Sequence, residues 1–197
     1  NKYFLQTADI DASSTSGWDG RAGFAPIGNG TTRFTGTYDG GGHTITGLFI
    51  NNTVLDFVGM FGVIDFSGNV KNTRLINVNI TGIKYVGGLA GYNSGTITDS
   101  YSTGSVNGIF VGGLAGGNTN GTITRSYSTC SVSSSNYAGG LVGVNDNGAI
   151  SNSYSTGSVS GSLVGGLAAS NGTGPTSGTI TNSYSTGSVS GSSFVGG

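Results

Sequence analysis

Charge is scarce in this chain of 197 residues, and one acidic residue type is missing altogether. Only 8% of the residues are charged, where roughly a quarter is usual, and every acid is an Asp because the sequence has no Glu. The net charge is −1, and the basic residues are scattered instead of forming a stripe that could follow a phosphate backbone. We therefore expect no nucleic-acid partner.

Cysteine, histidine and long apolar runs are almost absent too. Cys130 is the only cysteine, which excludes a disulfide framework and a thiolate metal site. His43 is the only histidine, which excludes a helix with two zinc-binding histidines. No apolar run approaches the roughly 20 residues that span a bilayer, and residues 1–6 do not resemble a signal peptide, so they are mature sequence or the start of a piece of a longer protein. The sequence predicts no membrane insertion, no metal and no cofactor.

Glycine, in contrast, is abundant and makes up 40 residues. Hydrophobic residues still amount to 35% of the chain, which is enough to form a core and unlike a disordered tail. Scattered Val, Ile and Leu between clusters of Gly, Ser, Thr and Asn are typical of many short strands joined by tight turns.

A short phrase built around two glycines recurs along the chain. It reads Val-Gly-Gly-Leu or a variant of it, and its copies begin at Val58, Val86, Val111, Ala138, Val164 and Val195. Counted between their first glycines, the copies are 28, 25, 27, 26 and 31 residues apart. A period of this size is the sequence signature of a repeat architecture.

A second phrase lies between the copies of the first. Its sequence at 95–106 is GTITDSYSTGSV, and it recurs at 121–132, 148–159 and 178–189. Each repeat therefore contains two or three short runs bounded by Gly and Asn, which is the punctuation of strands and not of helices. A unit of this size cannot bury an apolar face alone and must stack on its neighbours.

Stacking three short strands per repeat predicts an all-β fold, a right-handed parallel β-helix of about seven coils with roughly 25–31 residues each. The rise is about 4.8 Å per coil, the distance between hydrogen-bonded strands. We expect residues 58–197 to form the regular repeats. Residues 1–57 are expected to form irregular coils that cover the N-terminal end of the same solenoid. An insertion at 172–176 explains the longest spacing.

Alternation along each run predicts which side chains point inward. An Ile stands between small neighbours, with a Val nine residues later, and these form the predicted core ladders Ile97, Ile123, Ile150, Ile180 and Val106, Val132, Val159, Val189. Counting back by twos from Val106 places Gly104, Ser102 and Ser100 inside. Tyr101 then points outward, and position 99 has to be a corner. Cys130 replaces Gly104 in the next copy, which suits a small buried hydrophobe.

The outward tyrosines occupy one position of the repeat and should therefore form a column. With the threonines two residues further on they make a candidate interaction stripe of Tyr101, Tyr127, Tyr154, Tyr184, Thr103, Thr129, Thr156 and Thr186. Stacked aromatic side chains stabilise a sheet whether or not they bind anything. Tyr also offers a large contact area with a polar tip, which suits an interface. Both roles stay open.

The two phrases together resemble the GLUG motif of bacterial surface proteins. The resemblance is carried by V-G-G-L-x-G-x-N followed by G-T-I-T-x-S-Y-S-T-G-S-V, and by the preceding segments 26–28 and 34–45. Such repeats occur in filamentous-haemagglutinin-like adhesins and in the non-catalytic regions of IgA-specific metallopeptidases. The resemblance implies a secreted or cell-surface solenoid with a structural or adhesive role and no catalytic residues. The implied partners are other regions of a larger surface protein, copies of the chain, or a host or matrix glycan or protein.

Acidic residues in the N-terminal part raise two alternatives. Polysaccharide-cleaving enzymes also use parallel β-helices, and Asp9, Asp11, Asp19, Asp39 and His43 are the available polar groups. No nucleophile and base can be identified among them, and turn and cap roles suit aspartate equally. Asp9, Asp11 and Asp19 also offer oxygen ligands for calcium, but their spacing matches no calcium loop.

Two further alternatives concern the surface of the solenoid. Rows of outward Thr, interrupted at Ala149 and Ser151, resemble an ice-binding face, although Thr is a good strand residue in any case. A self-assembling extracellular filament or sheath is the principal alternative to adhesion, because an open strand edge invites pairing. Glycosylation is left open by N-x-T triplets at Asn29, Asn51, Asn79, Asn120 and Asn171.

Overall fold

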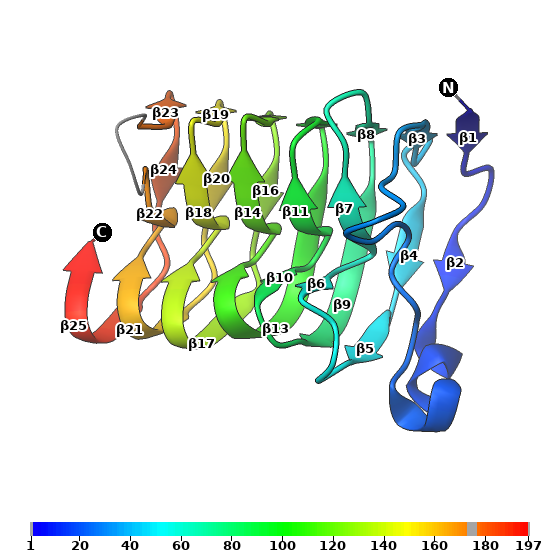
Figure 1. The fold of residues 1–197 in the computed structure, drawn as a ribbon, viewed down its shortest axis with the longest axis horizontal. Coiled ribbons are helices and arrows are strands. Elements are labelled where there is room, and N and C mark those ends of the chain that lie inside the picture. Colours follow the sequence, from blue (N-terminus) through cyan, green and yellow to red (C-terminus); the bar gives the residue numbers. More distant parts are fainter. Residues whose placement is uncertain (1, 173–176, 197) are drawn as a thin grey trace.

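The repeats fold into a stack of coils, as a computed structural model of the chain shows (Figure 1). The structure describes residues 2–172 and 177–196, so the predicted insertion lies, apart from Gly172, outside the described residues. Strands of successive coils pair in parallel and form three sheets of 7, 13 and 5 strands. The chain is a parallel β-solenoid, as the sequence predicts.

The first sheet contains the Thr-Ile-Thr run of each repeat. A β-branched residue between two short polar ones suits a half-buried strand, and the flanking Gly and Asn end it after three residues. Its strands are β1 (Tyr3–Leu5), β3 (Thr37–Asp39), β8 (Asn69–Lys71), β12 (Thr96–Thr98), β15 (Thr122–Thr124), β19 (Ala149–Ser151) and β23 (Thr179–Thr181).

The second sheet runs from the Tyr-Ser pair of each repeat to the Val-Gly phrase. One series of its strands is β2 (Ile10–Asp11), β4 (Thr44–Thr46), β9 (Arg74–Thr81), β13 (Tyr101–Gly112), β16 (Tyr127–Ser128), β20 (Tyr154–Ser155) and β24 (Tyr184–Ser185). The others are β5 (Phe49–Asn51), β6 (Phe57–Val58), β10 (Tyr85–Gly87), β17 (Ser131–Gly139), β21 (Val159–Gly165) and β25 (Val189–Gly196).

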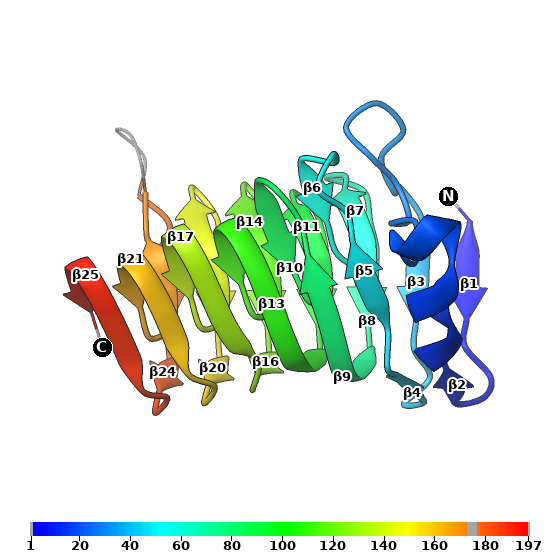
Figure 2. The same cartoon turned by 90° about the horizontal axis from the view of Figure 1, so that it is seen from below.

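The third sheet follows the two glycines. Its strands are β7 (Phe61–Ile64), β11 (Ala90–Asn93), β14 (Ala115–Thr119), β18 (Val142–Asp146) and β22 (Ala168–Ser170). The first coil differs from the rest, because two 3-10 helices, η1 (Ser13–Gly17) and η2 (Asp19–Arg21), follow β2. Figure 2 shows this helical segment at the N-terminal end of the stack.

The solenoid has about six turns, fewer than the seven that the sequence predicts. The first sheet does contain seven strands, but the third contains five. Among the described residues, the first coil pairs with β7 as the isolated bridges Ile27–Phe61 and Phe34–Ile64 and not as a strand, and no described strand follows β25. The difference therefore arises because the coils at the two ends are incomplete.

The core lies inside the coils and consists of columns of similar side chains. In the middle coils the Ile and Val ladders are at most 2% exposed, and their members there are Ile97, Ile123, Ile150, Val106, Val132 and Val159. Ile180 and Val189, in the last coil, are partly buried and pack against the same cluster. Full burial of each such side chain stabilises the fold by about 1.5–3 kcal/mol.

The core narrows from the N-terminal to the C-terminal coils. One inward position of the second sheet reads Ile10, Ile45, Leu75, Ser102, Ser128, Ser155 and Ser185 in successive coils. The serine side chains are short enough for the walls to touch, since Ser102 Oγ donates a hydrogen bond to the carbonyl of Gly113 at 2.6 Å. The third sheet has its largest residue at the same end, since one position reads Phe61, Ala90, Ala115, Val142 and Ala168 in successive coils.

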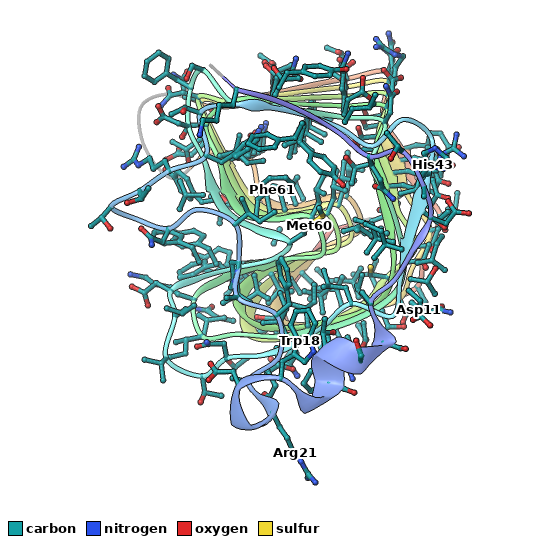
Figure 3. All side chains as sticks on the ribbon, turned by 90° about the vertical axis from the view of Figure 1, so that its right-hand side faces the viewer. Asp11, Trp18, Arg21, His43, Met60 and Phe61 are labelled. Carbon is teal, nitrogen blue, oxygen red and sulfur yellow. The ribbon has the colours of Figure 1, made fainter. Side chains whose placement is uncertain are left out.

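The wide N-terminal end is incompletely filled. A cavity of about 490 Å³ lies there, and its apolar lining is Phe4, Ile27, Phe34, Tyr38 and Phe61. A second cavity of about 300 Å³ shares Ile27 and Tyr38 with the first and extends to Trp18 and Met60. Figure 3 looks into this end and shows Met60 and Phe61 inside the walls, whereas Arg21 points away into solvent.

Candidate functional site

The predicted tyrosine column lies on the outside of the second sheet. Tyr101, Tyr127, Tyr154 and Tyr184 pair in register. Their ring centroids are 4.6, 4.7 and 5.3 Å apart, and neighbouring rings are within 11° of parallel. Each ring therefore covers the face of the next, and the column presents ring edges and hydroxyl groups to solvent.

The threonines of the stripe do not form a uniform row beside these rings. Thr129, Thr156 and Thr186 are exposed, and their backbone N–H groups bond to the preceding coil. Thr103 is only partly exposed, because its Oγ1 accepts a hydrogen bond from the backbone N–H of Asn77 at 2.9 Å. The accessible part of the stripe is therefore its C-terminal three coils.

A sharp corner stands just before each tyrosine. Asp99, Arg125, Asn152 and Asn182 all have φ between 47° and 50°, the left-handed conformation that turns the chain from the first sheet to the second. Arg125 donates two hydrogen bonds of 2.8 Å to the carboxylate of Asp99, and these bonds lower the pKa of Asp99. The corner that the sequence requires at position 99 is thus present in four coils.

The serine after each corner forms hydrogen bonds that join successive coils. The backbone N–H of Ser126 donates to Ser153 Oγ at 3.2 Å, while Ser126 Oγ donates to the carbonyl of Thr124 at 2.9 Å. The same pair of bonds recurs at Ser100 and Ser153. These inward serines are almost completely buried, so their hydroxyl groups satisfy polar backbone groups that water does not reach.

A column of buried asparagines at another corner is not identified from the sequence. Asn93, Asn118 and Asn145 are fully buried, and each donates from Nδ2 to the Oδ1 of the asparagine in the next coil at 2.7–2.8 Å, ending at Asn171. The Nδ2 groups of Asn93, Asn118 and Asn145 also donate to a backbone carbonyl two or three residues further along the chain. Asn118, for example, donates to the carbonyl of Gly121 at 3.2 Å. The asparagine ladder therefore pairs both amide atoms in its central members.

Glycine is required beside this ladder. A Cβ on Gly121 would lie 2.5 Å from Asn93 Nδ2 and 2.6 Å from Asn118 Oδ1. The sequence signal was the final Asn of V-G-G-L-x-G-x-N, which in a Gly-rich stretch looks like an ordinary turn residue. The N-x-T triplet at Asn171 is part of the ladder, because its Nδ2 donates to the carbonyl of Gly178 at 2.8 Å.

A second aromatic column is likewise not identified from the sequence. Phe57, Tyr85, Phe110 and Tyr137 pair in register immediately before the Val-Gly phrase. Their ring centroids are 5.0–5.7 Å apart and their planes are tilted by 12–24°. Tyr92 packs edge-on against the first two at 5.6 and 5.5 Å. The signal was the aromatic residue that precedes Val58, Val86 and Val111 in the repeat.

Two of the aspartates proposed for catalysis or calcium, Asp9 and Asp11, are bound by the backbone, whereas Asp19 lies in η2 with φ of 46°. Asp9 Oδ1 accepts from the N–H of Thr44 at 2.8 Å and lies 3.4 Å from His43 Nδ1, and Asp11 Oδ1 accepts from the N–H of Ser13 at 2.9 Å. These bonds to Thr44 and Ser13 lower the pKa of both carboxyl groups. In the described part of the chain, no group of three or more His, Cys, Asp or Glu residues could hold a metal ion.

Asp39 is the most strongly held carboxylate. It is 8% exposed and accepts hydrogen bonds from Asn72 Nδ2 at 2.9 Å, Gly41 N–H at 3.0 Å and Tyr3 Oη at 2.8 Å. Lys71 Nζ lies 3.1 Å away. Led by the bond from Asn72, these partners hold the pKa of Asp39 far below its usual range. A general acid needs the opposite shift, so Asp39 is suited to joining the first coils and not to proton donation.

The other features singled out in the sequence are the threonine rows and the single cysteine. The threonine rows of the first sheet are outward at least in part, and Thr124 and Ser151 share a hydrogen bond of 2.9 Å between their hydroxyl groups. Cys130 is fully buried, and burial raises the pKa of its thiol. Among the described residues, no helix has the length and apolar character to cross a membrane.

Comparison with known proteins places these features in context. The family model of the GLUG motif matches residues 82–107, 134–160 and 160–190. Halomucin of Haloquadratum walsbyi is 44% identical over 111 residues, which cover 54% of this chain and 1% of halomucin. A protein of Evansella cellulosilytica, named provisionally as a Gly-rich membrane protein, is 41% identical over 98 residues, or 48% of this chain and 11% of that protein. The chain thus spans a small part of each relative.

A solved structure shows the same fold. It is a protein of Bacteroides ovatus, named provisionally as an immunoglobulin A1 protease, and it superposes with a TM-score of 0.72 over 99% of this chain and 77% of its own. Sequence identity is 22%, so this likeness supports the architecture alone. The chain is therefore a β-solenoid, and three stretches of it match the model of the GLUG motif.

Proposed function

We propose that the chain is a non-catalytic structural and adhesive segment of a large secreted or cell-surface protein. The observation that carries this proposal is the continuous stack of register-matched coils, which uses its polar side chains to join one coil to the next. Such a stack is a stiff spacer whose length grows with the number of repeats. The names of the relatives, a halomucin and a membrane protein, support a surface location.

The distribution of carboxylates supports a non-catalytic role. Asp9, Asp11 and Asp39 are each bound to backbone or side-chain donors, and the shifts of their pKa values are all downward. Sugar-cleaving enzymes need one carboxyl group with a raised pKa beside a second carboxylate. Changing these three residues to Asn should leave the chain as inactive on a panel of polysaccharides as before. An activity that the change abolishes would contradict the proposal.

The adhesive surface we propose is the tyrosine column with its exposed threonines. Because the ring faces are covered, a partner would contact ring edges and hydroxyl groups, which favours a polar ligand such as a glycan or a protein loop over one that stacks on an aromatic face. The hydroxyl row repeats at the coil spacing, so an extended ligand could meet several equivalent contacts.

Binding to immobilised glycans and matrix proteins tests this surface. We expect a variant with Tyr127, Tyr154 and Tyr184 changed to Phe to stay folded but to bind at least about tenfold more weakly, because it keeps the stack and loses the hydroxyl groups of the accessible coils. A matched control changes Thr96, Thr122 and Thr179 to Ser on the first sheet and should bind normally. Equal binding by all three proteins would show that the column is only structural.

The proposed cell-surface location is tested separately. Antibodies raised against the purified chain should label intact cells of the source organism without permeabilisation. Labelling that appears only after the cells are opened would contradict a surface role. This result does not depend on whether the tyrosine column binds a ligand.

A further inference from the structure

The five N-x-T triplets of the sequence each carry the acceptor signal for an N-linked glycan, and the structure presents them in different ways. They begin at Asn29, Asn51, Asn79, Asn120 and Asn171. The signal includes a hydroxyl group two residues after the asparagine. That hydroxyl can act on the amide only where the backbone turns enough to bring the two side chains together. The conformation of each triplet therefore decides which asparagine can accept a glycan in the folded chain.

The loop between η2 and β3 carries the first triplet and stands out from the stack (Figure 2). Its base is fixed, because the N–H groups of Ile27 and Phe34 donate to backbone carbonyls at and beside β7 at 2.9 Å. Gly28 begins the loop with φ of 77°, and a Cβ there would lie 2.9 Å from the backbone nitrogen of Phe34. Residues 29–33 are all exposed. The tip of the loop is thus accessible, while its base is held by the second coil.

Asn29 and Thr31 hold the geometry in which hydroxyl and amide meet. The Oδ1 of Asn29 accepts hydrogen bonds from the hydroxyl of Thr31 at 2.8 Å, from the N–H of Thr31 at 2.9 Å and from the N–H of Thr32 at 2.7 Å. Three donors on the oxygen fix the amide, and its Nδ2 points away from them. Among the hydrogen bonds of the described residues, none uses the Nδ2 of Asn29. The nitrogen that would carry a glycan is therefore presented by an exposed residue.

The other triplets lack this geometry. The triplet of Asn79 lies inside the extended strand β9, where side chains two residues apart are about 6.6 Å from each other. Asn120 accepts a hydrogen bond from Asn147 Nδ2 at 2.6 Å, and Asn51 is the last residue of β5. Among the described residues, none of these three asparagines bonds to the threonine of its own triplet. Asn171 belongs to the asparagine ladder, and the threonine of its triplet lies outside the described residues.

We propose that Asn29 is the acceptor of an N-linked glycan in the folded chain. The donor is an oligosaccharide attached to a lipid pyrophosphate. The Nδ2 of Asn29 forms a bond to C1 of the first sugar, the bond from that carbon to the pyrophosphate oxygen breaks, and a proton from Nδ2 passes to the leaving pyrophosphate. Asn29 gives up no hydrogen bond of its Nδ2 in this reaction, whereas Asn120 first has to leave its turn and its bond to Asn147. The modification goes beyond the proposed structural and adhesive function.

The purified, folded chain tests the proposal when it is incubated with an oligosaccharyltransferase that recognises N-x-T and with a lipid-linked oligosaccharide. Mass spectrometry of the intact chain and of its peptides then gives the occupancy of each asparagine. We expect Asn29 to be occupied at least about tenfold more than Asn79 or Asn120, because reactivity scales with the fraction of the acceptor that already has the turn. Equal occupancy of another triplet, or a chain that stays unmodified, would overturn the proposal.

Asn29 and Asn120 form a matched pair, because both triplets read Asn-Gly-Thr. Synthetic peptides of residues 26–35 and 117–126 should be modified to similar extents, since the peptides lack the coils that fix the two conformations. A preference for Asn29 that persists in the peptides would overturn the role of the fold. In the full chain, Thr31→Val should abolish the modification of Asn29, and the control Thr122→Val should leave it unchanged. These reactions use purified protein and do not depend on surface labelling of cells, so the two proposals fail separately.

Discussion

At the scale of single residues, the solenoid depends on polar side chains that never reach solvent. The sequence predicts the inward Ile and Val because their alternation is visible in one repeat. Asn118 has no such signature, because asparagine among glycines is as typical of an exposed turn as of a buried amide. Its role appears only when coils are superposed and each amide meets the next at 2.7–2.8 Å.

Removing one amide from the ladder should destabilise the whole segment. Asn118→Ala leaves the Asn93 and Asn145 amides and the carbonyl of Gly121 short of a partner in a buried site, which costs about 1–3 kcal/mol for each unsatisfied group. We expect the free energy of unfolding in urea to fall by about 3 kcal/mol. The control Asn120→Gly, on the same coil, removes a solvent-exposed hydrogen bond from Asn147 Nδ2 at 2.6 Å at a residue with φ of 56°, and it should have little effect because water replaces an exposed partner. Equal losses for both would contradict a ladder-specific role.

Asp39 should make stability depend on pH. Its pKa is lower in the folded chain than the usual value near 3.9, so its contribution is present above that value and is lost as pH falls through the acid range. Asp39→Asn should therefore lower the thermal midpoint most at neutral pH, and the gap to the wild type should narrow on acidification below about pH 4. Exposed Asp56, changed to Asn, serves as the control. A gap that stays constant with pH would exclude the predicted titration.

At the scale of strands and columns, the sequence predicts more than it does for single polar residues. The Tyr101 column is predictable because one residue type recurs at one position. The Phe57–Tyr137 column is not, because Phe and Tyr alternate there and Leu163 takes the same place in a later coil. The wide N-terminal core is hidden for a similar reason, since β1 to β5 pair in parallel with the coils that follow them but do not carry the repeated phrases.

Position within the column should decide how much each tyrosine stabilises the chain. Tyr127 is stacked on both faces, whereas Tyr184 has one ring neighbour and is 56% exposed. Each aromatic pair contributes about 0.5–1.5 kcal/mol, so Tyr127→Ser should cost roughly twice as much as Tyr184→Ser in thermal or urea unfolding. Similar costs would mean that stacking is not the main contribution.

At the scale of the whole molecule, the coil is the unit of architecture. Each of the regular coils meets its neighbours through the same ladders, so a coil can be removed without changing the faces that come together. The sequence predicts this modularity from the repeat spacing alone. The sequence predicts about seven turns and the structure has about six. Among the described residues, the first coil contributes no strand to the third sheet, where it forms only two isolated bridges.

Deleting a full coil should be tolerated, and deleting half of one should not. Loss of residues 121–147 joins Asn120 to Gly148 and keeps every ladder in register, so we expect a cooperative transition with a thermal midpoint within about 5 °C of the original. Loss of residues 121–133 places polar side chains against the core and should abolish the transition. A full-coil deletion that unfolds the chain would show that its coils are not equivalent.

The direction of the hydrogen bonds between coils has a mechanical consequence. These bonds run along the long axis of the stack, so a pull on the two ends in Figure 1 loads them lengthwise and one coil at a time. We expect the segment to yield stepwise, each coil peeling off and lengthening the chain before the next is strained. In the spacer role proposed above, this stepwise yielding would limit the peak force that the segment transmits.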